Sequence, residues 1–451
     1  MEALPDRVLA FYGDDFTGST DAMEVLAMNG LPTVLSIGSI DANLIRQFPE
    51  ARAFGIAGIS RSRSPQWMDE CLAAQFESLH RFDAPLYHYK VCSTFDSSPE
   101  VGSIGRALDI GIGVFEGADR WVPILIGAPP LGRYSVFGNL FAVSDGSTHR
   151  LDRHPTMACH PVTPMAESDQ RRHLARQSAV SVELFDILSL QAEDARVRFG
   201  SLLERSPRAV LFDVLDQATL ERAGEIIWCE PGRAAFAVGS SGLEYALVAY
   251  WRRAGLLPEA PAVRHPGAVD RIAVVSGSCS PTTAAQIEHA RESGYVLIHA
   301  DAALLAVDDP IEFERVLILA LEASERGRSA VIYTALGPRD PAIADFREFV
   351  RLQGLDALDV NAALGMTLGR ILREWIKRTD LHRVCVAGGD TSGHVCQALG
   401  VRALTFLGPL APGSPLCRGH SGRTDGDIEI ALKGGQVGGP AYFEQVRLGA
   451  V

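Results

Sequence analysis

The first residues with the capacity for catalysis are two adjacent aspartates near the N-terminus, Asp14 and Asp15. An apolar run at residues 7–12 precedes them and predicts a strand, and the sequence after them predicts a helix that ends at Asn29. A carboxylate at the end of a strand in an α/β protein can serve as a general base or hold Mg²⁺. The simpler alternative is that one aspartate caps the helix and the other is solvated. Three hydroxyl residues are candidates for capping this helix: Thr17, Ser19 and Thr20.

Two later segments place cations and hydroxyls after further apolar runs. Arg61 lies within SRSRSP, and Lys90 begins the segment KVCSTFDSS. Arginine binds a carboxylate through two parallel hydrogen bonds, lysine adds a compact charge, and nearby hydroxyls can orient a polyol. Together with the acid pair, these segments favour a sugar acid as ligand. The alternative is that the arginine is a surface charge and that the second segment only starts a helix.

A long stretch at residues 127–165 lacks the periodicity of a helix or strand and is rich in glycine, proline and histidine. Loops of this length are usually functional, so we expect Arg133 and Asn139 to extend the wall of the same pocket. The histidines and Cys159 in this part of the chain match no zinc-binding spacing, which favours structural or substrate-lining roles over metal ligation.

Three turns rich in glycine and serine predict a nucleotide site in the C-terminal half. The first two follow apolar runs and open helices, where backbone amides and the helix N-terminus favour phosphate. Asp390 in the second turn is a candidate ligand for Mg²⁺. The third turn, after Lys433, can wrap the base or the terminal phosphates. The candidate nucleotide-binding residues are Ser276, Ser278, Ser280, Gly388, Gly389, Asp390, Thr391, Gly434 and Gly435.

Several better-defined sites and partners are not indicated by the sequence. It contains no G-x-x-x-x-G-K-[ST] P-loop, no G-x-G-x-x-G after a strand and no G-x-S-x-G elbow. The net charge of −13 weighs against a nucleic-acid partner, which a basic surface would bind. No apolar run approaches the length of a membrane span, and the first residues show no export signal, so we expect a cytoplasmic protein.

Short runs rich in Val, Ile and Leu alternate with segments of helical length, which predicts an α/β fold of mostly parallel sheets covered by helices. At 451 residues the chain exceeds a single core. We predict a substrate-binding domain at 1–254, a linker at 255–270 and a nucleotide-binding domain at 271–451, with the active site in the interdomain cleft. The predicted strands are residues 7–12, 32–37, 53–59, 87–92, 121–126, 209–214 and 234–238, then 271–276, 295–299, 330–334, 383–387 and 403–406.

Taken together, the motifs closely resemble the four-carbon acid sugar kinase family. In order they are GDDFTGSTD, SRSRSP, KVCSTFDSS, GRYSVFGNLFA with HPVTPM, GSSGLEYAL, VVSGSCSPTT, GGDTSG, GSPLCR and LKGGQVGG, and they span nearly the whole chain. The resemblance implies an acid-sugar-binding N-terminal domain and a nucleotide-binding C-terminal domain. It also implies phosphorylation of tetronates, 3-oxo-tetronates and similar acids with ATP and Mg²⁺.

The same resemblance implies individual contacts. ATP would contact Ser278, the turn at 388–391 and the glycines after Lys433. One loop is extended here, GNLFAVSDGSTHRLDRHPTMACHPVTPM, which implies a larger pocket wall and a branched acid such as 3-oxo-isoapionate. The acid sugar would contact Asp15, Arg61, Lys90, Val91, Cys92, Ser93 and Thr94.

We therefore predict an ATP-dependent kinase that phosphorylates a hydroxyl of a small sugar acid. Asp15 is the candidate base, with Asp14 orienting it or contacting the metal, and the sequence leaves that division of roles open. Two alternatives are a sugar-acid phosphatase or dehydrogenase, and a non-catalytic sensor of sugar acid and nucleotide. The expected partners are the sugar acid and ATP, without nucleic acid or membrane, and a homo-oligomer is compatible with the sequence.

Overall fold

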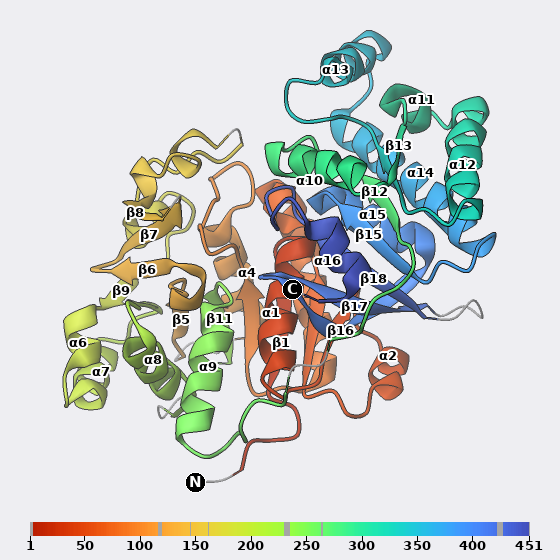
Figure 1. The fold of residues 1–451 in the computed structure, drawn as a ribbon. Helices are drawn as coiled ribbons and strands as arrows, with labels where there is room; N and C mark the ends of the chain where they lie inside the picture. Colours follow the sequence, from red (N-terminus) through yellow and green to blue (C-terminus); the bar gives the residue numbers. More distant parts are fainter. Residues whose placement is uncertain are drawn as a thin grey trace. The chain divides into compact units, whose positions relative to one another are not determined.

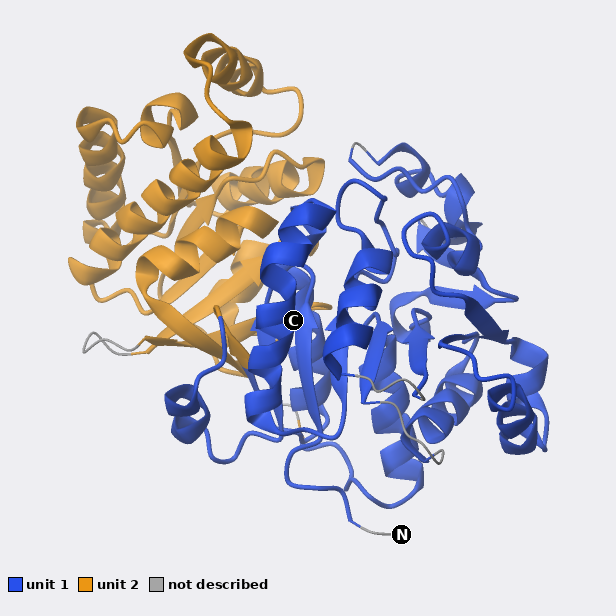
Figure 2. Ribbon diagram, turned by 180° about the vertical axis from the view of Figure 1, so that it is seen from behind, with its two compact units in different colours: residues 1–34, 39–261 blue, residues 35–38, 262–451 orange. Residues whose placement is uncertain are grey.

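The structure is a computed structural model that describes residues 3–115, 120–144, 146–160, 162–229, 235–262, 265–421 and 427–450. It divides into two compact units, shown in separate colours in Figure 2. Residues 1–34 and 39–261 form the N-terminal unit, and residues 35–38 and 262–451 form the C-terminal unit. The predicted two-domain α/β class is confirmed, and the division after Pro261 falls inside the segment predicted as a linker.

The main sheet of the N-terminal unit has the strand order β3-β1-β4-β11-β5-β10-β9, and β2, of which only the first two residues belong to this unit, pairs with β3. β1 pairs in parallel with both β3 and β4, so the carboxyl ends of these three strands lie along one edge. All residues of the three are buried, as expected for apolar strands covered on both faces. The strands are β1 (Leu9–Gly13), β2 (Thr33–Ser36), β3 (Ala53–Ala57), β4 (Tyr87–Lys90), β5 (Val122–Leu125), β9 (Val182–Phe185), β10 (Ala209–Phe212) and β11 (Phe236–Gly239).

Helices pack on this sheet in two groups. One group joins α1, α8 and α9, which lie in front of the sheet in Figure 1, and the other joins α3 and α4. The helices of the unit are α1 (Phe16–Met28), α2 (Ala42–Gln47), α3 (Pro65–Leu79), α4 (Ile104–Phe115), α5 (Gln170–Leu174), α6 (Ile187–Gln191), α7 (Ala195–Leu203), α8 (Gln217–Cys229) and α9 (Gly242–Arg253).

The stretch at 127–165, predicted as a structured excursion without helix or strand periodicity, contains a second sheet whose strands were not predicted. Strands β6 (Arg133–Val136), β7 (Asn139–Ser144) and β8 (Ser147–Arg150) form an antiparallel ribbon. Most of their residues are half-buried or exposed, so no regular apolar alternation marks them in the sequence. β9 escapes prediction for the same reason, since three of its four residues are only half-buried.

The C-terminal unit has the strand order β13-β14-β12-β15-β18-β17-β16. The first five strands are parallel, and β17 runs antiparallel to both of its neighbours. β17 and β18 were not predicted, and β16 is longer than the predicted 403–406. The strands are β12 (Ala273–Ser276), β13 (Val296–His299), β14 (Ala330–Tyr333), β15 (Arg383–Ala387), β16 (Val401–Ala411), β17 (Ser414–Ser421) and β18 (Ile428–Lys433).

The helices of the C-terminal unit cover this sheet, with α14 packed on α15 and α10 packed on α16. Pro281 occupies the first turn of α10, as predicted, and the Ser280 side chain caps that helix by accepting from the Thr283 amide. Among the residues described, no helix combines the length and apolarity needed to cross a membrane. The helices are α10 (Pro281–Glu292), α11 (Ala302–Ala306), α12 (Pro310–Glu325), α13 (Pro341–Gln353), α14 (Ala357–Lys377), α15 (Gly389–Leu399) and α16 (Tyr442–Leu448).

Candidate functional site

Three predicted substrate-binding segments meet at the carboxyl edge of the N-terminal sheet. β3, β1 and β4 are neighbours, and they are followed or ended by Arg61, Asp14 and Lys90 respectively. Backbone hydrogen bonds join the three turns, because the Asp14 amide donates to the Lys90 carbonyl at 2.8 Å and the Arg61 amide donates to the Asp14 carbonyl at 2.9 Å. The structure therefore brings together residues that are up to 76 positions apart in the sequence.

Asp14 is buried and holds Arg61 through two hydrogen bonds. Arg61 Nε donates to Oδ2 at 3.0 Å, and Nη2 donates to Oδ1 at 2.6 Å. Burial raises the pKa of Asp14, and Arg61 opposes that rise. Burial also disfavours the charged guanidinium, but Asp14 and Asp15 outweigh this effect and hold the pKa of Arg61 above its usual range. The alternative was that one of the two aspartates is only solvated. It is wrong for Asp14, whose side chain is buried and which is only 2% exposed.

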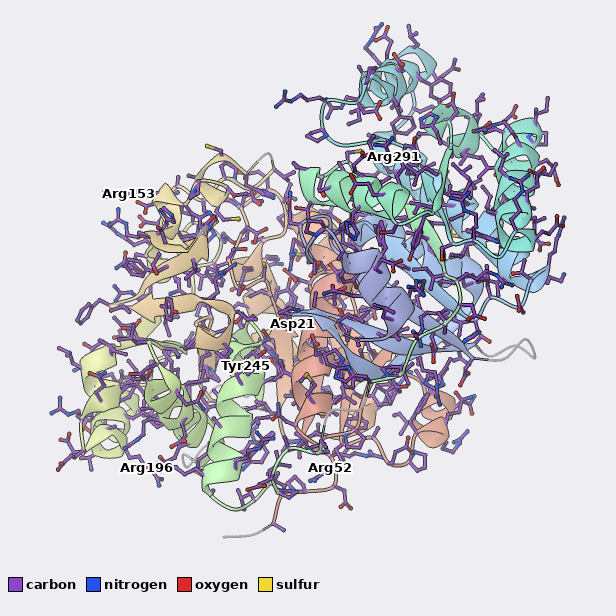
Figure 3. All side chains as sticks on the ribbon, in the orientation of Figure 1. Asp21, Arg52, Arg153, Arg196, Tyr245 and Arg291 are labelled. Atoms are coloured by element: carbon purple, nitrogen blue, oxygen red, sulfur yellow. The ribbon has the colours of Figure 1, made fainter. Side chains whose placement is uncertain are left out.

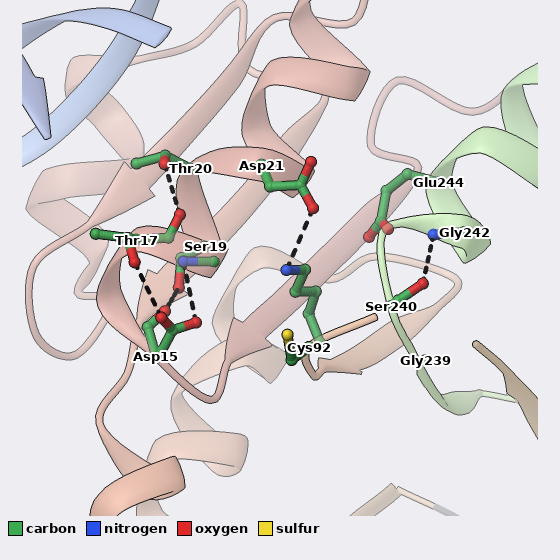
Figure 4. Close-up of polar contacts among 12 residues, drawn as sticks. Asp15, Thr17, Ser19, Thr20, Asp21, Cys92, Gly239, Ser240, Gly242 and Glu244 are labelled. Atoms are coloured by element: carbon green, nitrogen blue, oxygen red, sulfur yellow. Dashed lines mark hydrogen bonds and ion pairs between the residues drawn. The ribbon is translucent and has the colours of Figure 1, made fainter. Parts of the chain in front are cut away.

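Asp15 caps α1 while remaining open to solvent. Its Oδ1 accepts from the Gly18 amide at 3.0 Å, and its Oδ2 accepts from the Thr17 hydroxyl at 3.0 Å (Figure 4). The prediction of a hydroxyl cap is wrong, because Asp15 has the extended backbone that lets its carboxylate reach the free amides of the first turn. Its side chain is 23% exposed and lies 2.8 Å from Arg61 Nη2. Of the two acids, Asp15 is therefore the one that a ligand can reach.

Lys90 is buried against α1, where its Nζ pairs with Asp21 Oδ2 at 3.4 Å (Figure 4). Burial disfavours the ammonium, but Asp21 and Asp15 outweigh this effect and raise the pKa of Lys90. Gly18 makes the arrangement sterically possible, because a Cβ there would lie 3.1 Å from Lys90 Nζ and 2.1 Å from Asp15 Oδ1. Asp21 was not predicted from the sequence, although it lies within the motif GDDFTGSTD.

The motif GSSGLEYAL forms the end of β11 and the start of α9, and it packs beside this charged cluster. His88 Nδ1 lies 2.7 Å from Glu244 Oε1, and both side chains are fully buried. Burial raises the pKa of Tyr245, and Asp21 adds to that rise; both residues are labelled in Figure 3. The motif therefore supports the strand that carries Lys90.

The residues after Lys90 form a turn that Thr94 closes. Thr94 Oγ1 lies 2.6 Å from Asp96 Oδ1 and 2.9 Å from Cys92 Sγ. Burial raises the pKa of the Cys92 thiol. Burial also acts to raise the pKa of Asp96, but Arg61 and the Thr94 hydroxyl outweigh it, so this pKa is lowered. Asp96, a residue that sequence reasoning missed, is thus a second buried anion near Arg61.

The other predicted residues of this turn differ in what they offer a ligand. Val91 is fully buried, and its amide donates to the Gly239 carbonyl at 2.7 Å, so its side chain is not available. Cys92 and Ser93 are half-buried and remain the accessible side chains of the segment.

Arg133, on β6, is a half-buried cation that no carboxylate of the described residues neutralises. Its Nη1 donates to two backbone carbonyls, those of Leu131 at 3.0 Å and Gly132 at 3.3 Å, and its buried Nε has no partner. Burial lowers its pKa, an effect that Cys92 opposes. A bound carboxylate would therefore stabilise the charged form of Arg133.

Asn139, by contrast, forms hydrogen bonds within the protein through both the nitrogen and the oxygen of its side-chain amide. Its Nδ2 donates to the Phe137 carbonyl at 3.1 Å, and its Oδ1 accepts from the Ser168 hydroxyl at 2.8 Å. The turn before it is held by Asp213, which accepts from the Phe137 amide at 2.5 Å and the Gly138 amide at 2.9 Å. Sequence reasoning missed Asp213, although it follows β10 as Asp14 follows β1.

The histidines of this region have local structural partners. His154 Nδ1 accepts from the amides of Thr156 and Met157, each at 3.2 Å. His173 Nε2 lies 2.8 Å from the Ser97 hydroxyl, and burial lowers the pKa of His173 to about 4. Within the described ranges, no group of three or more His, Cys, Asp or Glu residues is arranged to hold a metal ion.

In the C-terminal unit, the three predicted nucleotide-binding turns also meet at one sheet edge. They follow β12, β15 and β18, which are parallel neighbours. The Gly277 amide donates to the Ala387 carbonyl at 3.1 Å, and the Gly388 amide donates to the Lys433 carbonyl at 2.9 Å. The close approach excludes side chains: a Cβ on Gly277 would lie 2.4 Å from Thr391 Oγ1, and Gly388 has φ +128°.

Thr283, which sequence reasoning did not single out, joins these turns. Its Oγ1 lies 3.0 Å from the hydroxyls of Ser278 and Ser280, 3.2 Å from the Gly435 carbonyl and 3.0 Å from Lys433 Nζ. The Ser280 hydroxyl also donates directly to the Gly435 carbonyl. The only signal in the sequence is that Thr283 lies three residues after the Ser280 cap.

The remaining candidates occupy different depths of the same edge. Ser276 is buried, and its Oγ accepts from the Ser278 amide at 3.4 Å, so it supports the first turn from inside. Gly389 and Gly434 are half-buried, while Asp390 is exposed in the first turn of α15. An exposed carboxylate beside turns that are predicted to bind phosphate suits Mg²⁺, which is usually held by one or two carboxylates together with substrate phosphates.

Comparison with known protein families matches the two units separately. Residues 9–247 match the family described as a sugar-binding N-terminal domain. Residues 273–443 match the family described as a nucleotide-binding C-terminal domain.

Similar proteins cover nearly the whole chain. The 3-oxo-isoapionate kinase of Paraburkholderia graminis is 49% identical over 98% of this chain and 94% of its own length. The 3-oxo-tetronate kinase of Cupriavidus necator is 30% identical over 97% of this chain and 96% of its own length. A crystal structure of a Salmonella typhimurium LT2 protein is 25% identical, with a TM-score of 0.76, and covers 97% of this chain and 98% of that protein.

Proposed function

This chain belongs to the four-carbon acid sugar kinase family, and we propose that it uses ATP to phosphorylate a hydroxyl of a branched 3-oxo sugar acid of the 3-oxo-isoapionate type. The kinase activity follows from two similar proteins that are named as kinases, which match 98% and 97% of this chain. The choice of acid is supported by the higher identity to the 3-oxo-isoapionate kinase, 49% against 30% for the 3-oxo-tetronate kinase.

The observation that carries the proposal is the reachable carboxylate of Asp15, held beside the half-buried guanidinium of Arg61 and near the buried ammonium of Lys90. A hydroxyl of the sugar acid lying against Asp15 passes its proton to that carboxylate as its oxygen attacks the γ-phosphorus of ATP, and ADP leaves. Asp14 does not take this role, because it is buried and both of its oxygens accept from Arg61. It keeps the guanidinium aligned instead.

The carboxylate of the sugar acid is assigned to Arg133. Arg61 already pairs with two aspartates and Lys90 pairs with Asp21, so neither carries charge in excess. Arg133 is half-buried and donates only to neutral backbone carbonyls. A carboxylate ligand would supply the charged partner that this guanidinium lacks, since its buried Nε has no hydrogen-bond partner.

The nucleotide is assigned to the edge formed by β12, β15 and β18. The turns at 276–280, 388–391 and 433–435 contain glycines, and at Gly277 and Gly388 there is no room for a side chain. Without side chains in the way, backbone amides can approach phosphate oxygens. Asp390 is the residue that would hold Mg²⁺, and the metal would neutralise phosphate charge there.

The test is a coupled ADP-release assay of the purified full chain over 3-oxo-isoapionate, 3-oxo-tetronates, threonates and erythronates, with the product identified by ³¹P NMR. We expect the highest kcat/KM with 3-oxo-isoapionate. A kcat/KM at least tenfold higher for a 3-oxo-tetronate would overturn the choice of acid while leaving the kinase in place.

The same assay separates the other candidate activities. Phosphate release from a phosphorylated sugar acid without ADP formation would instead identify a phosphatase, and NAD(P)-dependent oxidation would identify a dehydrogenase. Calorimetric binding of both ligands without any turnover would identify a sensor.

A further inference from the structure

Lys433 ends β18 beneath the nucleotide-binding turns, and no role proposed above uses its charge. The side chain is fully buried. Its Nζ donates to Thr283 Oγ1 at 3.0 Å, and within the described part of the chain it has no carboxylate partner. Lys90, the other buried lysine, pairs with Asp21. A buried ammonium without a counter-charge is costly, so its presence at a ligand-binding edge suggests a functional reason.

Thr283 connects Lys433 to the surface of the turn. One hydroxyl oxygen has one proton to donate and two lone pairs to accept with. Thr283 Oγ1 nevertheless has four polar neighbours within 3.2 Å: Lys433 Nζ, the hydroxyls of Ser278 and Ser280, and the Gly435 carbonyl. Lys433 is therefore connected to the glycine-rich turn through Thr283, whose hydroxyl accepts from Nζ and donates to the Gly435 carbonyl.

Burial lowers the pKa of Lys433 to about 8, and the Cys385 thiol on β15 opposes this effect. The ionisable groups on the other neighbouring elements are Cys417 on β17, Asp390, His394 and Cys396 on α15, and Tyr442 and Glu444 on α16. Glu444 is paired with Arg447, and the α10 side chains that face this region are the uncharged Thr283 and Gln286. The charge of Lys433 is thus free to respond to a ligand.

We propose that Lys433 is a titrating positioning residue of the nucleotide site, which takes up a proton when the phosphates of ATP bind above Thr283. The proposal rests on the nucleotide-binding role assigned to this edge. Lys433 does not touch the phosphates, because it is fully buried; it acts through the Thr283 hydroxyl and through its charge.

The direction of the effect follows from linkage. Phosphate charge favours the ammonium form, so the nucleotide-bound protein holds more protons than the free protein. ATP affinity should then be highest where Lys433 is already charged and should weaken as the pH rises past about 8. Between pH 7 and pH 9 the protonated fraction of the free protein falls roughly tenfold, so we expect a similar loss of affinity.

The experiment is isothermal titration of the full chain with MgATP, without sugar acid, in pairs of buffers that share a pH but differ in ionisation enthalpy. At pH 8 we expect uptake of roughly half a proton per ATP, and at pH 6.5 almost none. Lys433→Met should remove the uptake at pH 8 and flatten the pH dependence of the Kd. Lys377→Met, at the exposed end of α14, is the matched control and should behave like the unmodified protein.

The outcomes separate the two proposals. If ATP binds without proton uptake at pH 8, or if Lys433→Met retains the uptake, the role of Lys433 is wrong while the nucleotide site stands. If ATP does not bind at all, the assigned function of this unit is wrong. Should Lys433→Met fail to fold, Lys433→Arg gives a second variant, because arginine keeps its charge and should abolish the uptake.

Discussion

The acceptor edge of the N-terminal unit, made by Asp14, Asp15, Arg61 and Lys90, and the nucleotide edge of the C-terminal unit, made by the turns after β12, β15 and β18, share one plan. Each lies at the carboxyl ends of three neighbouring parallel strands. The acceptor edge is built from ion pairs, whereas the nucleotide edge is built from glycines and hydroxyls around Thr283. The same backbone framework therefore supports two different sets of side chains, one charged and one small and uncharged.

The difference between the two edges is the one we expect from the two ligands proposed for them. A small sugar acid offers few atoms, so its hydroxyl and carboxylate must be met by fixed charged groups. A nucleotide brings several phosphate oxygens, which backbone amides can bind if no side chain stands in the way. Charge substitutions should therefore do most damage at the acceptor edge, and added carbon atoms should do most damage at the nucleotide edge.

The sharpest test of the acceptor edge is Asp15→Asn. The amide oxygen can still accept from the Gly18 amide, so the α1 cap and the fold should persist, but the proton acceptor is gone. We expect kcat to fall by about 10²–10⁴-fold with a much smaller change in the KM for either substrate, measured by ADP release.

The matched control is Asp41→Asn, which alters the carboxylate that caps α2 by accepting from the Leu44 amide. This variant should keep its kcat, and both variants should unfold at temperatures close to that of the unmodified protein. If the Asp15 variant folds normally and turns over at the unmodified rate, Asp15 is not the base.

Arg133→Met tests whether the unpaired cation of the small sheet binds the substrate carboxylate. Loss of a charge-assisted hydrogen bond costs about 1.5–3 kcal/mol, so the KM for the sugar acid should rise about 10–100-fold. The kcat and the KM for ATP should change little. Steady-state kinetics with each substrate varied in turn gives the three constants.

Arg150→Met, on β8 of the same sheet, removes an arginine that already pairs with Asp152 and should leave all three constants unchanged. A normal KM for the sugar acid in the Arg133 variant would return the carboxylate to Arg61 or Lys90. It would also weaken the contrast between Arg133, which no carboxylate of the described residues pairs with, and Arg61 and Lys90, which are each paired with aspartates.

Much of this fold could be predicted because parallel strands buried on both faces appear as continuous apolar runs. Residues 383–387 were predicted with the bounds that the structure gives, and all five are buried. The small sheet was missed because its strands carry mixed side chains with no apolar alternation. β17 was missed because SPLCRGHS reads as a turn rather than a strand.

The candidate sites could likewise be predicted only in part: the sequence indicates which residues follow strands, but not which side chains they contact. Asp15, Arg61 and Lys90 were predicted because each follows or ends an apolar strand, where ligands bind in α/β sheets. Their partners Asp21 and Asp96 lie inside the quoted motifs, but only the folded chain shows which charge meets which. An aspartate cap was weighed beside the hydroxyl candidates, and sequence alone does not choose between them because it does not show where the helix begins.

Gly388→Ala tests the importance of space at the nucleotide edge. Gly388 has φ +128°, and a Cβ there would lie 2.8 Å from Thr391 Oγ1, so alanine must move the turn. We expect the KM for ATP to rise roughly tenfold, since strain of this kind costs about 1–3 kcal/mol, with the KM for the sugar acid unchanged.

Gly354→Ala is the control, because Gly354 also has positive φ, +62°, but has nothing within 4 Å of its Cβ position. It should lower stability without changing the KM for ATP. Equal KM values for ATP in the Gly388 variant and the control would show that close packing of the turns is not required for binding.

The segment around α5, where His173 contacts the Ser97 hydroxyl, should also respond to acid. Burial lowers the pKa of His173 to about 4, while its unfolded value is near 6.5. Because the folded state disfavours the protonated ring, the stabilisation is present above pH 6.5 and is lost as the pH falls toward 4. We expect the free energy of local opening to fall by about 1 kcal/mol between pH 6.5 and 5.5.

The measurement is amide hydrogen exchange of residues 170–177, corrected for the intrinsic effect of pH. His173→Gln keeps a side chain that can bond to Ser97 and should remove the slope. His80→Gln, at an exposed histidine that packs against Tyr87, should shift the opening free energy by a constant and keep the slope. A slope that persists without His173 would show that a group other than His173 carries the acid response.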